Sequence, residues 1–186
     1  MKPSEELKSE HRAIGKAIST LRAIARSARE DRAMPAALLD HELEFIRGFT
    51  EECHHRKEEE VLFPALAEQL QTAPINPLPE LLREHVRIRI LLDELREAVG
   101  SYAAGRTAEG NKLAALANKY ADLYIAHMRK ENVVLVGLIE NALPADKKLE
   151  VAERFLVIED ELGPGYHERY LGLADNLRDE GRRMAA

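Results

Sequence analysis

Four stretches of this chain carry apolar residues at intervals of three and four, and each of these stripes contains a histidine. The stretches and their histidines are 4–30 with His11, 35–71 with His55, 77–104 with His85, and 107–141 with His127. Residues at this spacing lie on one face of an α-helix. The sequence therefore predicts four long helices, each with an imidazole in its core-facing stripe.

The composition also indicates a helical chain. Ala, Leu and Glu are abundant, Trp is absent, and aromatic residues make up 5% of the 186 residues. These residue types favour helices over strands, so we expect an all-α protein. Because short turns separate the four stretches, we expect an up-down-up-down four-helix bundle.

The last part of the chain predicts an appendage to this bundle. We expect residues 1–143 to form the bundle and residues 144–186 to form a C-terminal helical extension that packs on it. A Gly-Pro-Gly sequence at 163–165 should divide the extension into two helices. Within the bundle, Pro64 should bend or end the second helix, because proline lacks a backbone donor and clashes with the preceding turn.

Charge and the single cysteine exclude several kinds of partner and site. With 27 Lys and Arg against 33 Asp and Glu, the net charge of -6 offers no positive field to nucleic acid or an anionic membrane. No apolar run approaches the roughly 18 residues of a membrane span, and the first residues lack an apolar signal segment. We therefore expect a cytoplasmic protein. Cys53 alone cannot form an internal disulfide or a thiolate cage, so a bound metal would have nitrogen and oxygen ligands.

The histidines lie symmetrically about the predicted turns. His11 and His55 are 44 residues apart, and their midpoint falls in the turn between the first two helices. His85 and His127 are 42 residues apart, and their midpoint falls in residues 105–107. Because a helix rises about 1.5 Å per residue, residues equally far from a turn lie at the same level. Four imidazoles should therefore meet in one layer.

Two glutamates accompany this layer. Glu59 follows His55 by four residues, and Glu131 follows His127 by four, which places each carboxylate one turn from an imidazole on the same helix face. A single histidine in an apolar stripe is usually a hydrogen-bonded core residue. Four at one level are different, because each unpaired polar group in a core costs about 1 to 3 kcal/mol. Two metal ions bridged by the carboxylates would satisfy all of these groups.

The same residues resemble a known family. Their order, with the stretches CHHRKEEEVLFPAL and AHMRKENVVLVGL, is similar to that of the hemerythrin-like, HHE cation-binding domains over residues 4–143. The resemblance implies a four-helix bundle around two non-heme iron ions with an oxo or hydroxo bridge. The ligands it implies are His11 and His55 on one iron, His85 and His127 on the other, and Glu59 and Glu131 as bridges. The donor set by itself suits Fe, Mn, Co or Zn, so iron follows from the resemblance alone.

One position departs from the oxygen-carrying members of this family. Arg89 stands where they have a second histidine on the third helix. Each iron then keeps an open position, which favours binding or reduction of a small oxidant (oxygen, peroxide or nitric oxide) over reversible carriage. Glu52, Tyr124 and His167 are alternative ligands for such a position. Arg89 itself either keeps its head in water at the edge of the stripe or pairs with a bridging carboxylate.

Two other functions are compatible with the sequence. In one, the protein is a metal-dependent sensor or interaction module that signals through the C-terminal helices. In the other, the bundle is metal-free and its histidines no longer bind an ion.

Two further histidines are expected at the surface. His54 lies about 100° round an α-helix from His55, so it should not share the inward direction, and with Glu58 it should form a surface pair. His41 is 14 residues from His55, about 21 Å along a helix, which is too far for the same metal ion.

Overall fold

The computed structural model describes residues 1–32, 34–105 and 107–185, and these residues form helices joined by turns and loops, without a β-strand. The all-α prediction is confirmed for them. The turns predicted after the first and third helices include residues 33 and 106, which lie outside the described residues. The elements are α1 (Pro3–Arg29), α2 (Ala36–Phe45), the π-helical segments η1 (Ile46–His55) and η2 (Glu58–Leu62), α3 (Phe63–Gln69), α4 (Leu78–Ala103), the 3-10 turn η3 (Thr107–Glu109), α5 (Gly110–Asn141), α6 (Ala145–Leu162) and α7 (Tyr166–Ala185).

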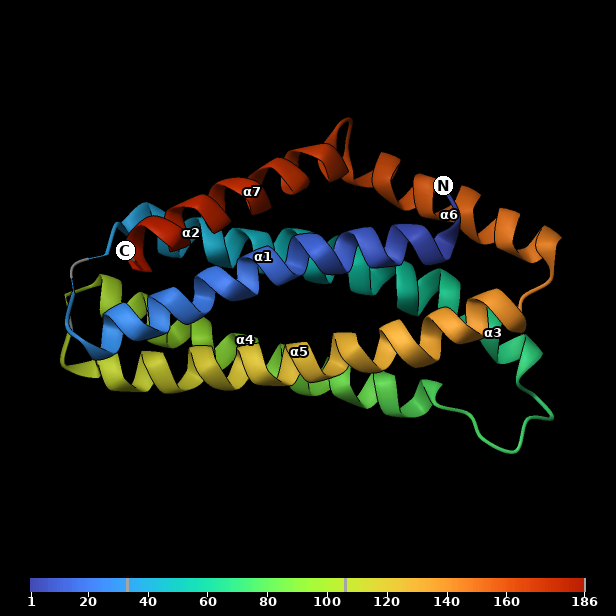
Figure 1. Ribbon diagram of the computed structural model, residues 1–186, viewed down its shortest axis with the longest axis horizontal. Helices are drawn as coiled ribbons and strands as arrows, with labels where there is room; N and C mark the ends of the chain where they lie inside the picture. Colours follow the sequence, from blue (N-terminus) through green and yellow to red (C-terminus); the bar gives the residue numbers. More distant parts are fainter. Residues whose placement is uncertain (33, 106, 186) are drawn as a thin grey trace.

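The long helical segments lie lengthwise side by side, with α6 and α7 along one flank (Figure 1). α1 contacts both α5 and α7, and α5 also contacts α4. α2 and η1 follow one another along the chain, and each contacts α1 and α7. The C-terminal helix α7 therefore covers the helical segment that ends in two adjacent histidines.

Local sequence explains where α1 begins and ends. Pro3 stands in the first turn of α1, where its missing N–H would have no helical partner. Glu5 and Glu6 in that turn, and Arg26 and Arg29 in the last turn, complement the helix dipole.

The break predicted at residues 163–165 separates α6 from α7. Gly163 and Gly165 have φ angles of 120° and 67°, a region that L side chains rarely adopt. The two glycines therefore let the chain leave one helix and start the next within three residues.

The second helical run is not a simple α-helix. Residues 46–55 and 58–62 are π-helical, which means i→i+5 hydrogen bonding and a wider turn. Pro64 follows directly, in the first turn of α3, and the helix continues to Gln69. Pro64 does not end the run, which passes from η2 directly into α3.

The buried apolar residues form two clusters with a polar layer between them. On α1, Leu7 belongs to one cluster and Ile14 to the other, with His11 between them. The same order on α4 is Leu81, His85 and Ile88. Each large apolar side chain contributes about 1.5 to 3 kcal/mol by burial. Apolar packing therefore holds the helices together on both sides of the polar layer.

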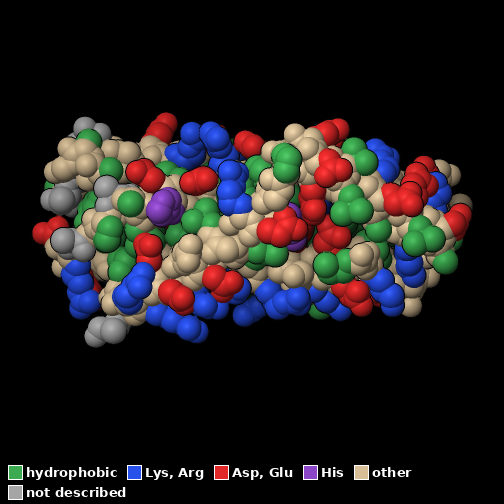
Figure 2. All heavy atoms as spheres, turned by 90° about the horizontal axis from the view of Figure 1, so that it is seen from above, with side chains coloured by type: hydrophobic (Ala, Val, Ile, Leu, Met, Phe, Trp, Pro, Cys, Tyr) green, Lys and Arg blue, Asp and Glu red, His purple; other side chains and the backbone are tan. Residues whose placement is uncertain are grey.

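The surface carries charges of both signs. Figure 2 looks onto the side of α6 and α7, where acidic and basic side chains both occur across the visible face. Among the described residues, no helix is both long enough and apolar enough to cross a membrane.

A close approach between α5 and α1 predicts the effects of two glycine substitutions. A Cβ at Gly110 would stand 2.3 Å from the carbonyl oxygen of Ala28, whereas one at Gly137 would have nothing within 4 Å. Gly110→Ala should lower the free energy of unfolding by about 1 to 3 kcal/mol, because the backbone must move. Gly137→Ala should raise it by roughly 0.5 to 1 kcal/mol through helix propensity. Urea unfolding followed by circular dichroism measures both, and effects of the same sign would contradict this packing.

Glu42 of α2 is a buried carboxyl group without a partner. Its side chain is 1% exposed, and neither oxygen has a hydrogen-bond partner among the described residues. Burial raises the pKa of Glu42 well above its usual value. The folded protein therefore holds this group in its neutral form.

Replacement of Glu42 should change how stability depends on pH. The unfolded chain releases this proton near pH 4.5 while the folded chain retains it, so stability falls as the pH rises above that value. Glu42→Gln should therefore be more stable than the wild type at about pH 7, and the difference should shrink toward about pH 5. Chemical denaturation of both proteins at the two pH values measures this. A difference that does not depend on pH would show that Glu42 is ionised in the fold.

Candidate metal centre

Seven buried side chains from α1, the η1–η2 run, α4 and α5 form the polar layer. Each is at most 5% exposed, and the seven are His11, His54, His55, Glu58, His85, His127 and Glu131. They form two groups that share Glu58. Position A is His11, His54, Glu58 and Glu131, and position B is His55, Glu58, His85 and His127. Within each group the possible ligand atoms lie within 4.8 Å of one another.

Outer hydrogen bonds orient four of the five imidazoles in the same way. In each of them, Nδ1 donates to an oxygen outside the layer, and Nε2 is left facing the other members of the layer. The pairs are His11 with Asn132 (3.0 Å), His54 with Glu10 (2.8 Å), His85 with Glu59 (2.6 Å) and His127 with Glu84 (2.9 Å). Outer partners of this kind fix the tautomer and the ring direction of metal-binding histidines.

Glu131 lies between the two positions. Its Oε2 is 3.2 Å from Nε2 of His11, and its Oε1 is 3.0 Å from Nε2 of His127. Burial by itself would raise the pKa of Glu131, but His127 and His11 hold it well below its usual value. The carboxylate is therefore ionised, with one oxygen directed at each position.

Glu58 has a similar placement on the second helical run. Its Oε1 is 3.9 Å from Nε2 of His54, and its Oε2 is 3.4 Å from Nε2 of His85. Glu58 and Glu131 thus each present one oxygen to position A and the other to position B. Carboxylates with this placement can bridge two metal ions.

Several inward atoms of the layer lack hydrogen-bond partners, which is rare in a protein interior. Among the described residues they include Nε2 of His11 and of His54, and both oxygens of Glu58 and of Glu131. Each unpaired group of this kind costs about 1 to 3 kcal/mol. Cations at A and B would pair with all of them, so the residues fit two metal ions. Nitrogen and oxygen ligands in this proportion suit Fe, Mn, Co or Zn.

The electrostatics of position B also favour a cation. Burial alone would lower the pKa of His85, but the nearby carboxylates of Glu131, Glu58 and Glu59 raise it to about 11. Its Nε2 lies 3.0 Å from Nε2 of His127. The carboxylates therefore favour a positive charge at this place, which a bound metal ion would also supply.

The structure brings five of the six sequence-predicted ligands into the layer. The five are His11, His55, His85, His127 and Glu131. The sixth, Glu59, lies on the outer side, where it accepts hydrogen bonds from Nδ1 of His85 and from Arg89, both at 2.6 Å. Glu58, one residue earlier, takes the inward place that the spacing assigns to Glu59.

The expectation that His54 lies at the surface is wrong, because its side chain is 0% exposed. That expectation assumes an α-helix, in which adjacent side chains diverge by about 100°. Residues 46–55 are π-helical instead, and the wider turn lets His54 and His55 both face the layer. The sequence does contain the signal, since His54 and Glu58 have the same four-residue spacing as His55 and Glu59. His41 is exposed, as expected.

His55 differs from the other imidazoles of the layer. Its Nε2 accepts a hydrogen bond of 2.9 Å from the hydroxyl of Tyr124, and its Nδ1 is 3.1 Å from Glu51. Its ring stacks on that of His85, with centroids 3.9 Å apart. Burial and the neighbouring His85 hold the pKa of His55 well below its usual value. The surroundings of His55 therefore favour the neutral form of this imidazole within position B.

The remaining alternative ligands lie outside both positions. Glu52 is half exposed, and one of its oxygens is 3.6 Å from Nε of Arg47. His167 of α7 reaches toward the layer, but its Nε2 contacts Oε1 of Glu10 at 3.2 Å rather than a member of either position. Both side chains therefore have partners of their own.

Arg89 pairs with two carboxylates at the edge of the layer. Its guanidinium lies 2.8 Å from Glu51 and 2.6 Å from Glu59, and its side chain is 41% exposed. These two glutamates contact the rings of His55 and His85. Arg89 therefore neutralises the outer carboxylates rather than either inward glutamate.

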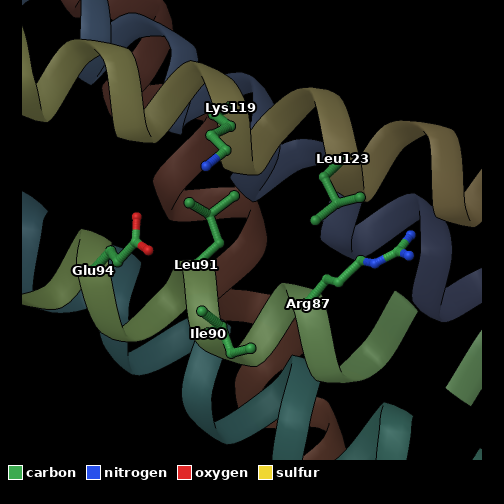
Figure 3. Close-up of a pocket in the computed structure, with 6 residues that line it drawn as sticks. All are labelled: Arg87, Ile90, Leu91, Glu94, Lys119 and Leu123. Carbon is green, nitrogen blue, oxygen red and sulfur yellow. The ribbon is translucent and has the colours of Figure 1, made fainter. Parts of the chain in front are cut away.

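Two surface hollows differ in their relation to the centre. His11 lines one of about 440 Å³, together with Lys8, Arg12 and Arg129. The other, of about 410 Å³, lies between α4 and α5 (Figure 3). Its lining residues are Arg87, Ile90, Leu91, Glu94, Lys119 and Leu123, and none of them belongs to A or B. The first hollow alone of these two reaches a residue of the layer.

The sequence of this chain is similar to that of known proteins. Residues 2–139 match the family model described as the hemerythrin HHE cation binding domain. The chain belongs to this family. It is 28% identical over 158 residues to uncharacterized proteins of Mycobacterium bovis and Mycobacterium tuberculosis. The match covers 84% of this chain but only 60% of the length of these relatives. No solved structure matches the chain.

Metal binding tests the different roles of the two adjacent glutamates. Glu58→Gln should lower the bound metal from two ions per chain to one or none, because an amide offers one oxygen acceptor and no charge. Glu59→Gln should still bind two ions, with an affinity lower by up to about 100-fold, the usual range for loss of an outer partner. Elemental analysis after anaerobic loading with Fe(II) and dialysis measures both. A larger loss in Glu59→Gln would assign the inward place to Glu59.

Proposed function

We propose that this hemerythrin-family chain holds two iron ions, joined by an oxo or hydroxo bridge, and binds or reduces a small oxidant there. The oxidant is oxygen, peroxide or nitric oxide. One observation carries the proposal: four imidazole Nε2 atoms face two glutamates, each of which presents one oxygen to A and one to B. Residues 1–143 form an up-down-up-down four-helix bundle around the ions in this proposal, and residues 144–186 form a helical extension on it.

The proposed ligands divide between the two positions. They are His11 and His54 at A, His85 and His127 at B, and Glu58 and Glu131 between them. His55, the third imidazole of position B, is a further possible donor, since its Nδ1 has no hydrogen-bond partner among the described residues. Iron bound by this set would supply the redox chemistry and the open position that a small oxidant requires.

The surrounding residues restrict what can reach the centre. The inward glutamates and the imidazoles of position B are at most 1% exposed, so bulk solvent is excluded from them. His11 is the member of the layer that lines a surface hollow. This arrangement supports a reactant of a few atoms rather than a large organic substrate.

The proposal includes a cytoplasmic location and no nucleic-acid or membrane partner. The support is the net charge of -6, together with the mixture of acidic and basic side chains on the face in Figure 2. A chain with this charge has no long-range attraction for polyanions.

A second candidate is a metal-dependent sensor or interaction module that acts through the C-terminal helices. One observation favours it. Glu10, which accepts a hydrogen bond from His54, also contacts His167 of α7. Glu10 therefore connects His54 at position A to α7 of the extension.

Anaerobic loading followed by spectroscopy tests the proposed function. The chain should bind two Fe(II) ions, and oxygen or peroxide should then produce the near-ultraviolet and visible absorption of an oxo-bridged ferric pair. His85→Ala should lose this absorption because it removes a ligand of position B. His41→Ala, which removes an exposed imidazole, is the matched control and should behave as the wild type.

Two results would contradict the proposal. One is wild-type protein that binds less than one ion per chain after loading in excess Fe(II). The other is fully loaded protein whose spectrum does not respond to oxygen, peroxide or nitric oxide.

A further inference from the structure

A buried lysine connects the C-terminal extension to α1. Nζ of Lys57 contacts Glu6 and Glu10 of α1 at 2.7 Å each and Glu159 of α6 at 2.5 Å, and the side chain is 1% exposed. Burial by itself would lower the pKa of Lys57, but the carboxylates, Glu10 foremost, raise it. The lysine is therefore charged, and a buried charge of this kind is stable only while its partners stay in place.

This ammonium also accounts for a third cluster of possible metal ligands. Glu10, Cys53 and Glu159 lie close enough together to hold an ion. Lys57 donates hydrogen bonds to both carboxylates of this cluster. Burial raises the pKa of the Cys53 thiol, so it remains protonated. The cluster is therefore a salt-bridge site in which an ammonium group occupies the place of a metal ion.

The two carboxylate oxygens of Glu10 have different partners: one contacts His54, a candidate metal ligand, and the other contacts Lys57 of the salt-bridge site. Oε2 accepts a hydrogen bond from Nδ1 of His54 at 2.8 Å, and Oε1 contacts Lys57 at 2.7 Å and Nε2 of His167 at 3.2 Å. Burial would raise the pKa of Glu10, but Lys57, His167 and His54 hold it well below its usual value. The direction of the His54 ring therefore depends on a carboxylate that groups from α6 and α7 help to fix.

α7 also packs directly on the π-helical segment η1. The ring of His167 lies 5.5 Å from that of Phe49, and the hydroxyl of Tyr166 donates to the carbonyl of Gly48 at 3.0 Å. Tyr170 occupies the space beside Gly48, where a Cβ would stand 2.0 Å from its hydroxyl oxygen. Figure 1 shows α7 lying along this part of the molecule. The extension thus supports both the outer partner of His54 and the backbone that carries it.

We propose that α6 and α7 form a clamp on position A, in which Glu159 and His167 are positioning residues that act on His54 through Lys57 and Glu10. The clamp rests on the proposed function in one respect, which is that His54 binds a metal ion. Metal binding and docking of the two helices then strengthen each other by the same factor, because linkage between two equilibria is reciprocal.

Hydrogen exchange in the wild-type chain measures this coupling. Zn(II) is the probe, because it accepts the same donor set and has no redox chemistry. Amides in residues 166–177 should exchange severalfold more slowly in the zinc-loaded protein than in the metal-free protein. Residues 110–118 at the far end of α5 serve as the internal reference. Equal exchange of residues 166–177 in the two states would overturn the clamp.

Substitutions test the same coupling from the other side. His167→Ala should weaken zinc binding at A by about 10- to 100-fold and leave B occupied, whereas His167→Gln, which keeps a donor toward Glu10, should retain most of the affinity. Gly48→Ala should weaken A as well, because the added methyl displaces Tyr170. Gly172→Ala on α7 is the matched control, since a Cβ there has nothing within 4 Å. Zinc titration against a competing chelator gives both affinities.

The possible results distinguish the clamp from the proposed function. Two zinc ions bound as tightly in His167→Ala as in the wild type would overturn the clamp and leave the proposed function intact. A wild-type chain that binds no metal would overturn both. If His167→Ala does not fold, Gly48→Ala and the exchange measurement on the wild type decide. Selective loss at A with recovery in His167→Gln supports the clamp, because a general loss of stability would weaken both positions equally.

Discussion

Two glutamates buried between apolar clusters are the constraint on which this structure depends. Glu58 and Glu131 are 0% exposed, and a buried carboxylate is costly unless cations or hydrogen-bond donors face it. Imidazoles from four helical segments turn Nε2 toward them. That inward direction is possible only because each ring has an outer oxygen for Nδ1. The layer therefore has an inner set of polar groups, the two glutamates and the Nε2 atoms, and an outer set of oxygens that accept hydrogen bonds from Nδ1.

Apolar packing fixes the positions of the helices that carry this layer. The two hydrophobic clusters lie on either side of it, so the helices are fixed both before and after they pass the centre. The π-helical segment η1 adds a local change of phase that brings two adjacent histidines to the same side. Segments of this kind are rare, and they are frequent at functional sites.

The two proposed metal positions have different surroundings. The outer partners near B include Glu59, which is paired with Arg89, a residue that is 41% exposed. The outer partner of His54 at A is Glu10, which is 1% exposed and held by Lys57 and His167. Position B thus borders a charged edge of the molecule, whereas position A borders the C-terminal helices. Because of this asymmetry, the C-terminal extension can act on position A through Glu10.

The sequence by itself determined the helical class, the positions of the four histidine-bearing stripes and the level at which they meet. These follow from spacing along the chain, and five of the six predicted ligands do lie in the layer. The choice between Glu58 and Glu59, and the burial of His54, depended on the angular phase of the second helical run. Residue spacing cannot give this angular phase, because it assumes an α-helix. Residues 46–55, which contact α7 and carry two histidines of the polar layer, are π-helical. The links among Lys57, Glu10 and His167 join residues more than 45 positions apart, so only the tertiary structure could show them.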